Sequence, residues 1–521
     1  MVYRGKPSPG CALCRDRRLL CDRRRPSCSQ CLRANRECSG YQDLQALRIH
    51  DQSKEVAAKA QAQSESQSQS RRGARKSTNP STAAHSAALT LRMPPAIPSS
   101  AGEQAMSFIF KIYVGDAQSR GLLSYLPKLL TDDPSTALQA TLKAVGLASM
   151  SRAHSLPELK YSAGLEYGKA LVATNHALRN TLVAKSDSTL AAVVLLSTYE
   201  MITSPESIGG ENFMSGWSNH VDGATKLLEL RGMEQMEFPA GRALFTLVRM
   251  QVAFNNIFSR QRRSPQLTAL SLAAKTYRDS DSQSIEDFYA IVVQLADLSI
   301  ESDKIFTDNT SANPVDIIRK ALHLDADLVS WALSLNPTWR YKTIETPHVT
   351  NTNYHQPYSF YHGNKYHVYP NVDLASMWTN YHQTRIIIQG IIQAMCGQLL
   401  KSDPAHDCQH TLLQSIAISK QMVADICTSV PFYFISGETG IGGLLRLSWP
   451  LFIAADCAVT TPARKEWIRQ TLEKIGEVAG IQQALTMSRF LKRGYIIPFV
   501  PGNAGEEGIS DWYMSFSFHG T

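Results

Sequence analysis

Residues 11–38 of this chain read CALCRDRRLLCDRRRPSCSQCLRANREC, and this stretch decides how the N-terminal part folds. Its six cysteines are spaced C-x2-C-x6-C-x6-C-x2-C-x6-C. The spacing repeats one motif twice, because each C-x2-C pair is followed six residues later by a third cysteine. The cysteines are Cys11, Cys14, Cys21, Cys28, Cys31 and Cys38.

The ligand requirement of zinc assigns these cysteines to two ions. A structural zinc takes four ligands in a tetrahedron, and thiolate is one of its preferred donors. Six sulfurs satisfy two tetrahedra when two of the sulfurs bridge both metals. The internal repeat makes the first cysteine of each pair, Cys11 and Cys28, the expected bridges. The remaining ligands then divide in sequence order into Cys14 with Cys21, and Cys31 with Cys38.

A disulfide framework is the alternative for six closely spaced cysteines. The chain begins with polar and basic residues instead of an apolar signal segment, so no feature of the sequence directs it to an oxidising compartment. We therefore expect a reduced cluster that binds metal. The other cysteines are scattered, and we expect them to be ordinary buried thiols. They are Cys396, Cys408, Cys427 and Cys457.

Positive charge is concentrated in the same segment. Residues 1–40 carry ten basic and three acidic side chains, a surplus of seven in a chain whose net charge is +8. Some of these arginines offset the cluster itself, since six thiolates and two zinc ions sum to about −2. The surplus that remains is typical of a module that binds a polyanion. We expect double-stranded DNA as the partner.

The segment resembles the DNA-binding domain of fungal binuclear zinc cluster transcription factors. The resemblance rests on GCALCRDRRLLC at residues 10–21, on DRRRPSC at 22–28, and on the later cysteines with CSGY at 38–41. Pro26 stands where that family turns between its halves, and proline pre-sets φ for such a reversal. The resemblance implies a helix that reads a C-G-G triplet through a basic pair. Here that pair is Arg17 and Arg18.

The helix expected over residues 14–21 departs from the family pattern twice. The family usually has lysine where Arg18 stands, and arginine keeps the charge while adding a fork that can bond guanine O6 and N7 together. The family also usually has lysine at the position of Leu20, so one phosphate contact or helix-end charge is absent. Contacts to phosphates fix register without reading sequence. We expect them from Arg15, Arg23, Arg24 and Arg25.

Composition divides the chain into a zinc cluster at residues 9–41, a disordered linker at 42–100 and a large all-α region at 101–521. The linker contains AQAQSESQSQS at residues 60–70, a polar tract that cannot form a core. The basic stretch RRGARK at residues 71–76 fits a nuclear import signal and equally a solvated linker charge.

Residues 101–521 are long enough to bury a sizeable core. Apolar residues recur there at helical spacing and strand-like alternation is scarce, so the pattern predicts a helical domain. No apolar run reaches the roughly 18 residues that a membrane-spanning helix needs. Helices are expected over residues 106–114, 136–152, 189–202, 220–230, 245–258, 315–335, 377–400, 411–430 and 464–485.

This large region resembles the second type of fungus-specific transcription factor domain. Matching stretches follow one another in the family's order: STYE at residues 197–200, WSNHVDGA at 217–224 with LRG at 230–232, DICTSVP at 425–431 and GLLRLSWP at 443–450. The resemblance implies a helical regulatory domain without catalytic residues. Within it, the apolar stripe that begins at Trp217 ends at Gly232, which is expected to adopt a left-handed C-cap.

Two other stretches and one histidine resemble chemical sites, but their residues do not support that interpretation. GETGIGG at residues 437–443 lacks the Gly-Lys-Ser/Thr ending of a phosphate-binding loop, so we expect a loop before a helix. The histidines of residues 341–369 lack the spacing of a helical zinc site. We expect that stretch to be a surface loop or inter-helix connection, with a pocket wall as the lesser alternative. His220 is expected to be a hydrogen-bonded helix histidine, not a catalytic one.

These features predict a nuclear, zinc-dependent, sequence-specific DNA-binding regulator of RNA polymerase II genes, and not an enzyme. One module makes few contacts, so a homodimer on two half-sites is expected, with co-regulators or the transcription machinery as further partners. The first alternative is a metabolite receptor or enzyme-like domain carrying a DNA-binding tag, which would show a deep pocket with convergent titratable groups. The second is a zinc-stabilised protein-interaction module, which would lack the steep salt dependence of DNA binding.

Overall fold

In the computed structural model, the chain divides into two units, residues 1–50 and 51–521. In the first unit the structure describes residues 11, 13–14, 17, 21–22, 24, 27–36 and 38. In the second it describes residues 100–111, 125–203, 215–262, 264–277, 280–307, 313–345, 360–435 and 440–493. The predicted linker therefore lies outside the described residues, apart from Ser100.

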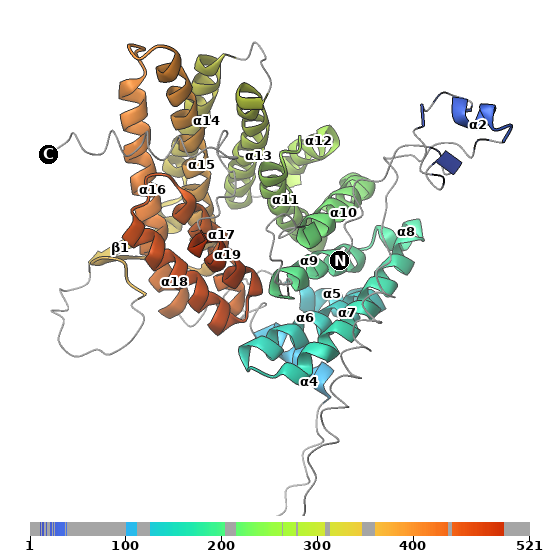
Figure 1. The fold of residues 1–521 in the computed structure, drawn as a ribbon. Helices are drawn as coiled ribbons and strands as arrows, with labels where there is room; N and C mark the ends of the chain where they lie inside the picture. Colours follow the sequence, from blue (N-terminus) through green and yellow to red (C-terminus); the bar gives the residue numbers. More distant parts are fainter. Residues whose placement is uncertain are drawn as a thin grey trace, which may run out of the picture. The chain divides into compact units, whose positions relative to one another are not determined.

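Helices make up nearly all of the described part of the second unit (Figure 1). The first helices are α4 (Ala101–Ile109), α5 (Leu126–Asp132), α6 (Thr136–Ala153), α7 (Pro157–Leu178), α8 (Thr181–Ala184), α9 (Asp187–Thr203) and α10 (Ser215–Arg231). Then come η3 (Gly232–Met236), α11 (Pro239–Ser259), α12 (Pro265–Ala274), η4 (Lys275–Tyr277), α13 (Ser280–Thr307) and α14 (Pro314–Ser334). The last elements are η5 (Pro337–Trp339), β1 (Lys342–Glu345), β2 (Lys365–Val368), α15 (Val372–Ser402), α16 (Gln409–Ile435), α17 (Gly440–Asp456), α18 (Pro462–Ala479) and α19 (Gln482–Lys492). The predicted all-α class is confirmed.

Local sequence signals explain several helix ends. Ser100 caps α4 through a capping box, in which its side chain and that of Glu103 each bond the other residue's backbone N–H. Proline stands in the first turn of α7, α11, α12, α14 and α18, where its missing N–H leaves no hydrogen bond unmade. Gly232 follows α10 with φ +58°, so the predicted left-handed C-cap is confirmed.

Two predicted elements are wrong. The single helix expected over residues 464–485 is two helices, α18 and α19, because Gly480 adopts φ +67° and ends the first of them. A Cβ atom at Gly480 would also lie 2.3 Å from Cβ of Arg152, so α18 ends in close contact with α6. Residues 440–443 of the glycine-rich stretch form the first turn of α17 instead of a loop, while residues 437–439 lie outside the described part.

A two-stranded hairpin connects α14 to α15. Strands β1 and β2 pair antiparallel, with Thr343 opposite His367. His367 is buried against α16, where its Nε2 lies 3.5 Å from Oδ1 of Asp425. The prediction of an inter-helix connection is confirmed for the described part of this stretch, but β2 packs against α16 and buries His367, so it is not a surface loop.

The first and last helices of the second unit share one core. Helix α6 packs against α7 and α9, and near the end of the chain α18 packs on α6 and α19 on α9. Nη1 of Arg152 in α6 donates to Oε1 of Gln482 in α19 over 2.5 Å, although 330 positions separate the two residues. A single apolar cluster extends from Ala105 to Leu491. Among the described residues, no helix is both long and apolar enough to cross a membrane.

Candidate metal centre

Two short helical segments each carry one cysteine of the first unit. Cys14 lies in one of them, and Cys31 lies in the other, α2 (Ser29–Arg33). Cys28 is the N-cap of α2, and its sulfur accepts a hydrogen bond from the N–H of Cys31 at 3.4 Å. The N-terminal turn of α2 therefore points its sulfurs toward the interior of the cluster, where Cys28 and Cys31 are buried.

Asp22 holds the start of α2 in place. Its Oδ1 accepts from the backbone N–H of Ser29 at 3.0 Å, and its Oδ2 accepts from the Ser29 hydroxyl at 2.5 Å. These hydrogen bonds lower the pKa of Asp22 below its usual value. Nε of Arg24 adds an ion pair at 3.6 Å. The carboxylate of Asp22 therefore interacts with partners inside the first unit.

The six sulfurs form two overlapping groups of four. Within each group all ligand atoms lie within 4.8 Å of one another. The two cysteines expected to bridge, Cys11 and Cys28, belong to both groups. The first group is Cys11, Cys14, Cys21 and Cys28, and the second is Cys11, Cys28, Cys31 and Cys38.

The sulfur separations fit a zinc–thiolate cluster. Four sulfurs placed about 2.3 Å from a zinc ion in a tetrahedron lie about 3.8 Å from one another. The Sγ atoms of Cys11 and Cys28 are 3.8 Å apart, and those of Cys14 and Cys28 are 3.7 Å apart. Sγ of Cys31 lies 3.7 Å from that of Cys11. A disulfide requires about 2.05 Å, and none of the ten cysteines, all of which the structure describes, forms one.

Crowding makes the sulfurs hard to ionise without a cation. Burial raises the pKa of Cys14 well above its usual value. The neighbouring Cys28 thiol, followed by burial, raises the pKa of Cys31 to about 12. A bound dication offsets this cost, because the thiolate is the form that binds metal. The donor set and its spacing therefore suit a soft metal such as zinc.

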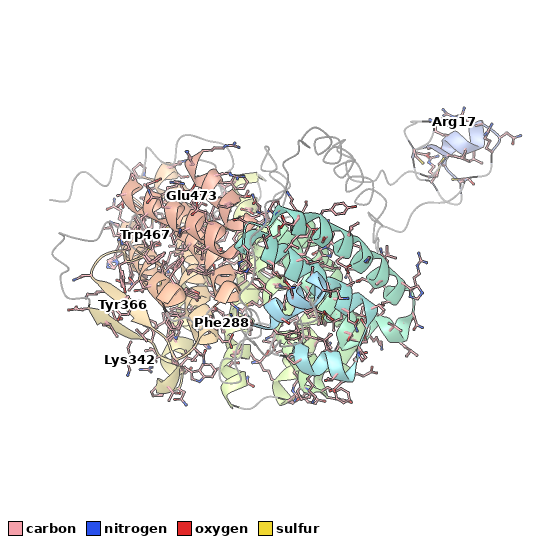
Figure 2. The ribbon with its side chains drawn as sticks, turned by 90° about the horizontal axis from the view of Figure 1, so that it is seen from below. Arg17, Phe288, Lys342, Tyr366, Trp467 and Glu473 are labelled. Carbon is pink, nitrogen blue, oxygen red and sulfur yellow. The ribbon has the colours of Figure 1, made fainter. Side chains whose placement is uncertain are left out.

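Two of the six arginines predicted to contact DNA are among the described residues. Arg17 is exposed, and its backbone N–H bonds the carbonyl of Leu13 at 3.3 Å, which continues the turn that carries Cys14. Figure 2 labels Arg17 in this unit. The side chain of Arg24 is 79% exposed. The other four lie outside the described residues: Arg15, Arg18, Arg23 and Arg25.

Two further arginines, Arg33 and Arg36, entered the charge count but received no predicted role. Arg33 lies in the last turn of α2 and Arg36 follows that helix, and both are exposed. Their position in the sequence is the signal that identifies them. They follow the second C-x2-C pair, where the internal repeat predicts a helix equivalent to the one after the first pair. They extend the basic surface of the module to its second half.

The polar residues of α10 in the second unit are engaged with their neighbours. Nε2 of His220 lies 3.3 Å from the hydroxyl of Tyr167, which donates to Glu200 at 2.5 Å. Burial lowers the pKa of His220 to about 4, so the imidazole is neutral near pH 7. Asp222 accepts a hydrogen bond from Asn255 at 3.0 Å. The prediction of a hydrogen-bonded helix histidine is confirmed.

Comparison with known families assigns both units. The model of the "Fungal specific transcription factor domain" matches residues 107–493. The chain belongs to this family of fungal transcription factors. The model of the "Fungal Zn(2)-Cys(6) binuclear cluster domain" matches residues 9–47 of this transcription factor. Both resemblances seen in the sequence are thereby confirmed, and the protein is a non-enzymatic regulator. Zinc binding, DNA binding and nuclear action are what this family implies.

Several known regulators are similar to this transcription factor. Transcription factor dbaG of Emericella nidulans is 23% identical over 399 residues, which cover 72% of this chain and 87% of that protein. White-opaque regulator 2 of Candida albicans is 36% identical over 56 residues, 11% of this chain and 13% of that protein. The aspercryptin biosynthesis cluster-specific transcription regulator atnN of Emericella nidulans is 41% identical over 56 residues, covering 11% and 9%. No solved structure matches the chain.

Proposed function

We propose that this transcription factor regulates RNA polymerase II genes in the nucleus by binding a C-G-G triplet through a cluster of two zinc ions. The observation that carries the proposal is the pair of overlapping sulfur groups that share Cys11 and Cys28. Two tetrahedral ions need eight sulfur bonds, and six cysteines supply them only when two sulfurs bridge. The remaining cysteines complete one site each in pairs, Cys14 with Cys21 and Cys31 with Cys38.

The two halves of the module differ in a way that supports base reading by the first half alone. Three and four residues after Cys14 stand Arg17 and Arg18. The equivalent positions after Cys31 hold Ala34 and Asn35, which lack cationic forks. Arginine bonds guanine O6 and N7 in the major groove, which a short helix can enter.

Arginines near this helix are proposed to contact phosphates. Arg24 is exposed beside the cluster, with Nε 3.6 Å from Asp22. That ion pair restrains the direction of its side chain and leaves most of it in solvent. Contacts of this kind fix the register of a protein on the duplex without reading bases. The same role is proposed for Arg15, Arg23 and Arg25.

A second half-site completes the proposed mode of binding. One small module touches few base pairs, and useful specificity in a genome needs more of them. We propose that two copies of the chain bind paired triplets, with the spacing set by the dimer. The large helical unit is proposed to contact co-regulators or the transcription machinery.

Binding measurements on matched duplexes test the base-reading role. Arg18→Ala is expected to weaken binding to a C-G-G duplex by about 1–3 kcal/mol and to change binding to a scrambled duplex less. Arg24→Ala is expected to weaken binding to both duplexes alike and to lower the slope of log affinity against log salt by about one. Arg36→Ala, in the half without the basic pair, is the matched control. Equal losses on both duplexes for Arg18→Ala would contradict base reading at this position.

A further inference from the structure

Helix α7 carries large apolar residues on the face that points away from the core. The helix packs against α6 and α9 through its buried face, which includes Ala163 and Ala170. Figure 1 shows α7 in the teal part of the chain, beside α6. On the outer face, Tyr161, Leu165 and Val172 are 38%, 40% and 51% exposed. These apolar side chains remain in contact with solvent in the described part of the chain.

The spacing of these residues is that of a seam between paired helices. From Tyr161, the intervals to the next members are four, three and four residues, which places all of them in one line along the helix. The members after Tyr161 are Leu165, Gly168 and Val172. A Cβ atom at Gly168 would meet no described atom within 4 Å, so the line has a notch at this position. Single exposed apolar residues are ordinary, whereas a continuous line of them indicates an interaction surface.

An antiparallel copy of α7 fits this line of apolar residues. When the twofold axis passes midway between Leu165 and Gly168, each Leu165 lies opposite Gly168 of the other copy. Tyr161 of each copy then lies opposite Val172 of the other, because the intervals are symmetric about that axis. The notch at the glycine leaves room for the leucine side chain and lets the two backbones approach closely. The surface therefore complements itself, as a twofold interface between identical chains requires.

The charges at the two ends of the line favour the same direction of pairing. Glu158 stands three residues before the line and Arg179 seven residues after it, and both are exposed. Antiparallel pairing brings these unlike charges together, whereas parallel pairing would place like charges side by side. Helical side chains lean toward the N-terminus of their own helix, so Glu158 and Arg179 of the other copy lean toward one another. Lys169, near the middle of the line, is neutralised by Glu166 of its own helix at 2.7 Å.

We propose that two copies of this chain pair through α7, with the helices antiparallel and Leu165 of each copy packed on Gly168 of the other. This proposal rests on the proposed binding of two copies to paired triplets, and it names the surface that joins them. A single pair of helices buries little area, so the contact is weak, with a dissociation constant in the micromolar range. The full chain is tested without DNA, so that association is measured apart from triplet recognition.

Sedimentation velocity at increasing micromolar concentrations tests the surface. The parent chain is expected to shift from monomer to dimer as its concentration rises. Leu165→Glu and Val172→Glu place carboxylates in the apolar line, and each is expected to weaken association at least tenfold. The matched controls are Leu322→Glu in α14 and Val478→Glu in α18, whose parent residues are 43% and 49% exposed. Both controls should associate as the parent does.

Exchanging the charges at the ends of the line tests the direction of pairing. Glu158→Arg alone places two cations together at each end of an antiparallel pair and should weaken association at least threefold. Combining Glu158→Arg with Arg179→Glu restores unlike charges at both ends and should return the affinity to the parent value. In a parallel pair Glu158 would face Glu158, so the single variant would only exchange one like pair for another.

Circular dichroism reports whether each variant is folded, and the charge variants alone decide the outcome if the variants of the apolar line do not fold. A parent chain that stays monomeric would overturn the proposal and leave another protein as the occupant of this face. Dimerisation that Leu165→Glu and Val172→Glu do not weaken would also overturn it, as would a double charge variant without rescue. Binding to a duplex with a single C-G-G triplet is measured separately and reports on the zinc cluster, so failure of one proposal is distinguishable from failure of the other.

Discussion

The carboxylate of Asp22 accepts both hydrogen-bond donors of Ser29, the backbone N–H at 3.0 Å and the hydroxyl at 2.5 Å. Ser29 is the first residue of α2, and the cysteine before it caps that helix. This contact therefore ties the segment that follows the third cysteine to the sulfurs of the second half.

We expect Asp22→Ala to loosen the metal cluster. Without the two hydrogen bonds, the first turn of α2 is less well held, and Cys28 and Cys31 are presented less precisely to the metal. Zinc should transfer to a chromophoric chelator several-fold faster than from the parent protein. Ser27→Ala, in the same segment, is the matched control. An unchanged transfer rate in Asp22→Ala would show that the cysteines position α2 without help.

The sharing of sulfurs predicts unequal effects of cysteine substitutions. Cys28→Ser removes a ligand from both sulfur groups, whereas Cys38→Ser removes one from a single group. We expect native mass spectrometry of the full chain to find one zinc ion in Cys38→Ser and no zinc ion in Cys28→Ser. The reason is that a structural zinc needs four protein ligands. The same zinc content in both variants would argue against bridging by Cys28.

Burial predicts the cost of breaking ion pairs in the helical unit. The side chains of Arg385 and Asp325 are 11% and 10% exposed. Asp325→Asn should lower the free energy of unfolding by about 3–5 kcal/mol, because it leaves a buried guanidinium without its counter-charge. The pair of Arg319 and Asp316 is 74% and 51% exposed. Asp316→Asn should therefore change stability by about 0–1 kcal/mol in the same urea titration.

The burial of Asp456 predicts that replacing this residue increases stability by an amount that depends on pH. Burial raises the pKa of this carboxyl to about 7, and its Oδ1 has no hydrogen-bond partner among the described residues. In the unfolded chain an aspartate ionises near about pH 3.9. Between these two values the folded protein holds a proton that the unfolded chain has lost. The contribution of Asp456 to stability therefore falls as pH rises from about 4 to about 7 and stays low above it.

Asp456→Asn removes this titration. The stability of the variant relative to the parent should rise by on the order of 2 kcal/mol between about pH 5 and about pH 8. Urea unfolding at the two pH values measures the difference directly. A difference between variant and parent that stays constant with pH would mean that this carboxyl ionises at its ordinary value in the fold.

Alanine substitutions at two glycines with left-handed backbones separate the cost of backbone strain from the cost of a steric clash. Gly232→Ala meets no atom within 4 Å, so its cost is the backbone penalty alone, about 1–2 kcal/mol. Gly480→Ala has the same kind of penalty and places a Cβ atom 2.3 Å from Cβ of Arg152. We expect a clearly larger loss of stability at Gly480, measured by thermal unfolding. Equal losses would mean that α6 shifts to accommodate the methyl group.

The cysteine arrangement could be predicted because all ligands of the cluster lie close together in the sequence. Zinc demands four ligands, and the repeat then singles out Cys11 and Cys28 without any knowledge of tertiary contacts. Gly232 could be predicted for a similar reason, since the apolar stripe of one helix visibly ends there. Both inferences use short-range information.

Features that depend on distant segments could not be predicted in this way. Gly480 lies between two apolar stretches whose spacing continues as if one helix ran through them, and its left-handed backbone and its packing against Arg152 are seen only in the structure. The sequence around His367 predicts only a connection, because the buried partner of this histidine, Asp425, lies in a later helix. The ion pair of Arg249 with Glu286 likewise requires α11 and α13 to be adjacent.

The contact between Arg152 and Gln482 has a consequence for synthesis of the chain. A ribosome releases α6 and α9 long before it has made α18 and α19, the helices that cover them. Part of the apolar surface of α6 and α9 therefore stays exposed until the last helices emerge from the ribosome. Chaperones protect such surfaces during this period. A premature stop codon anywhere upstream of α19 would leave that surface permanently open, so truncated chains should be cleared by proteolysis.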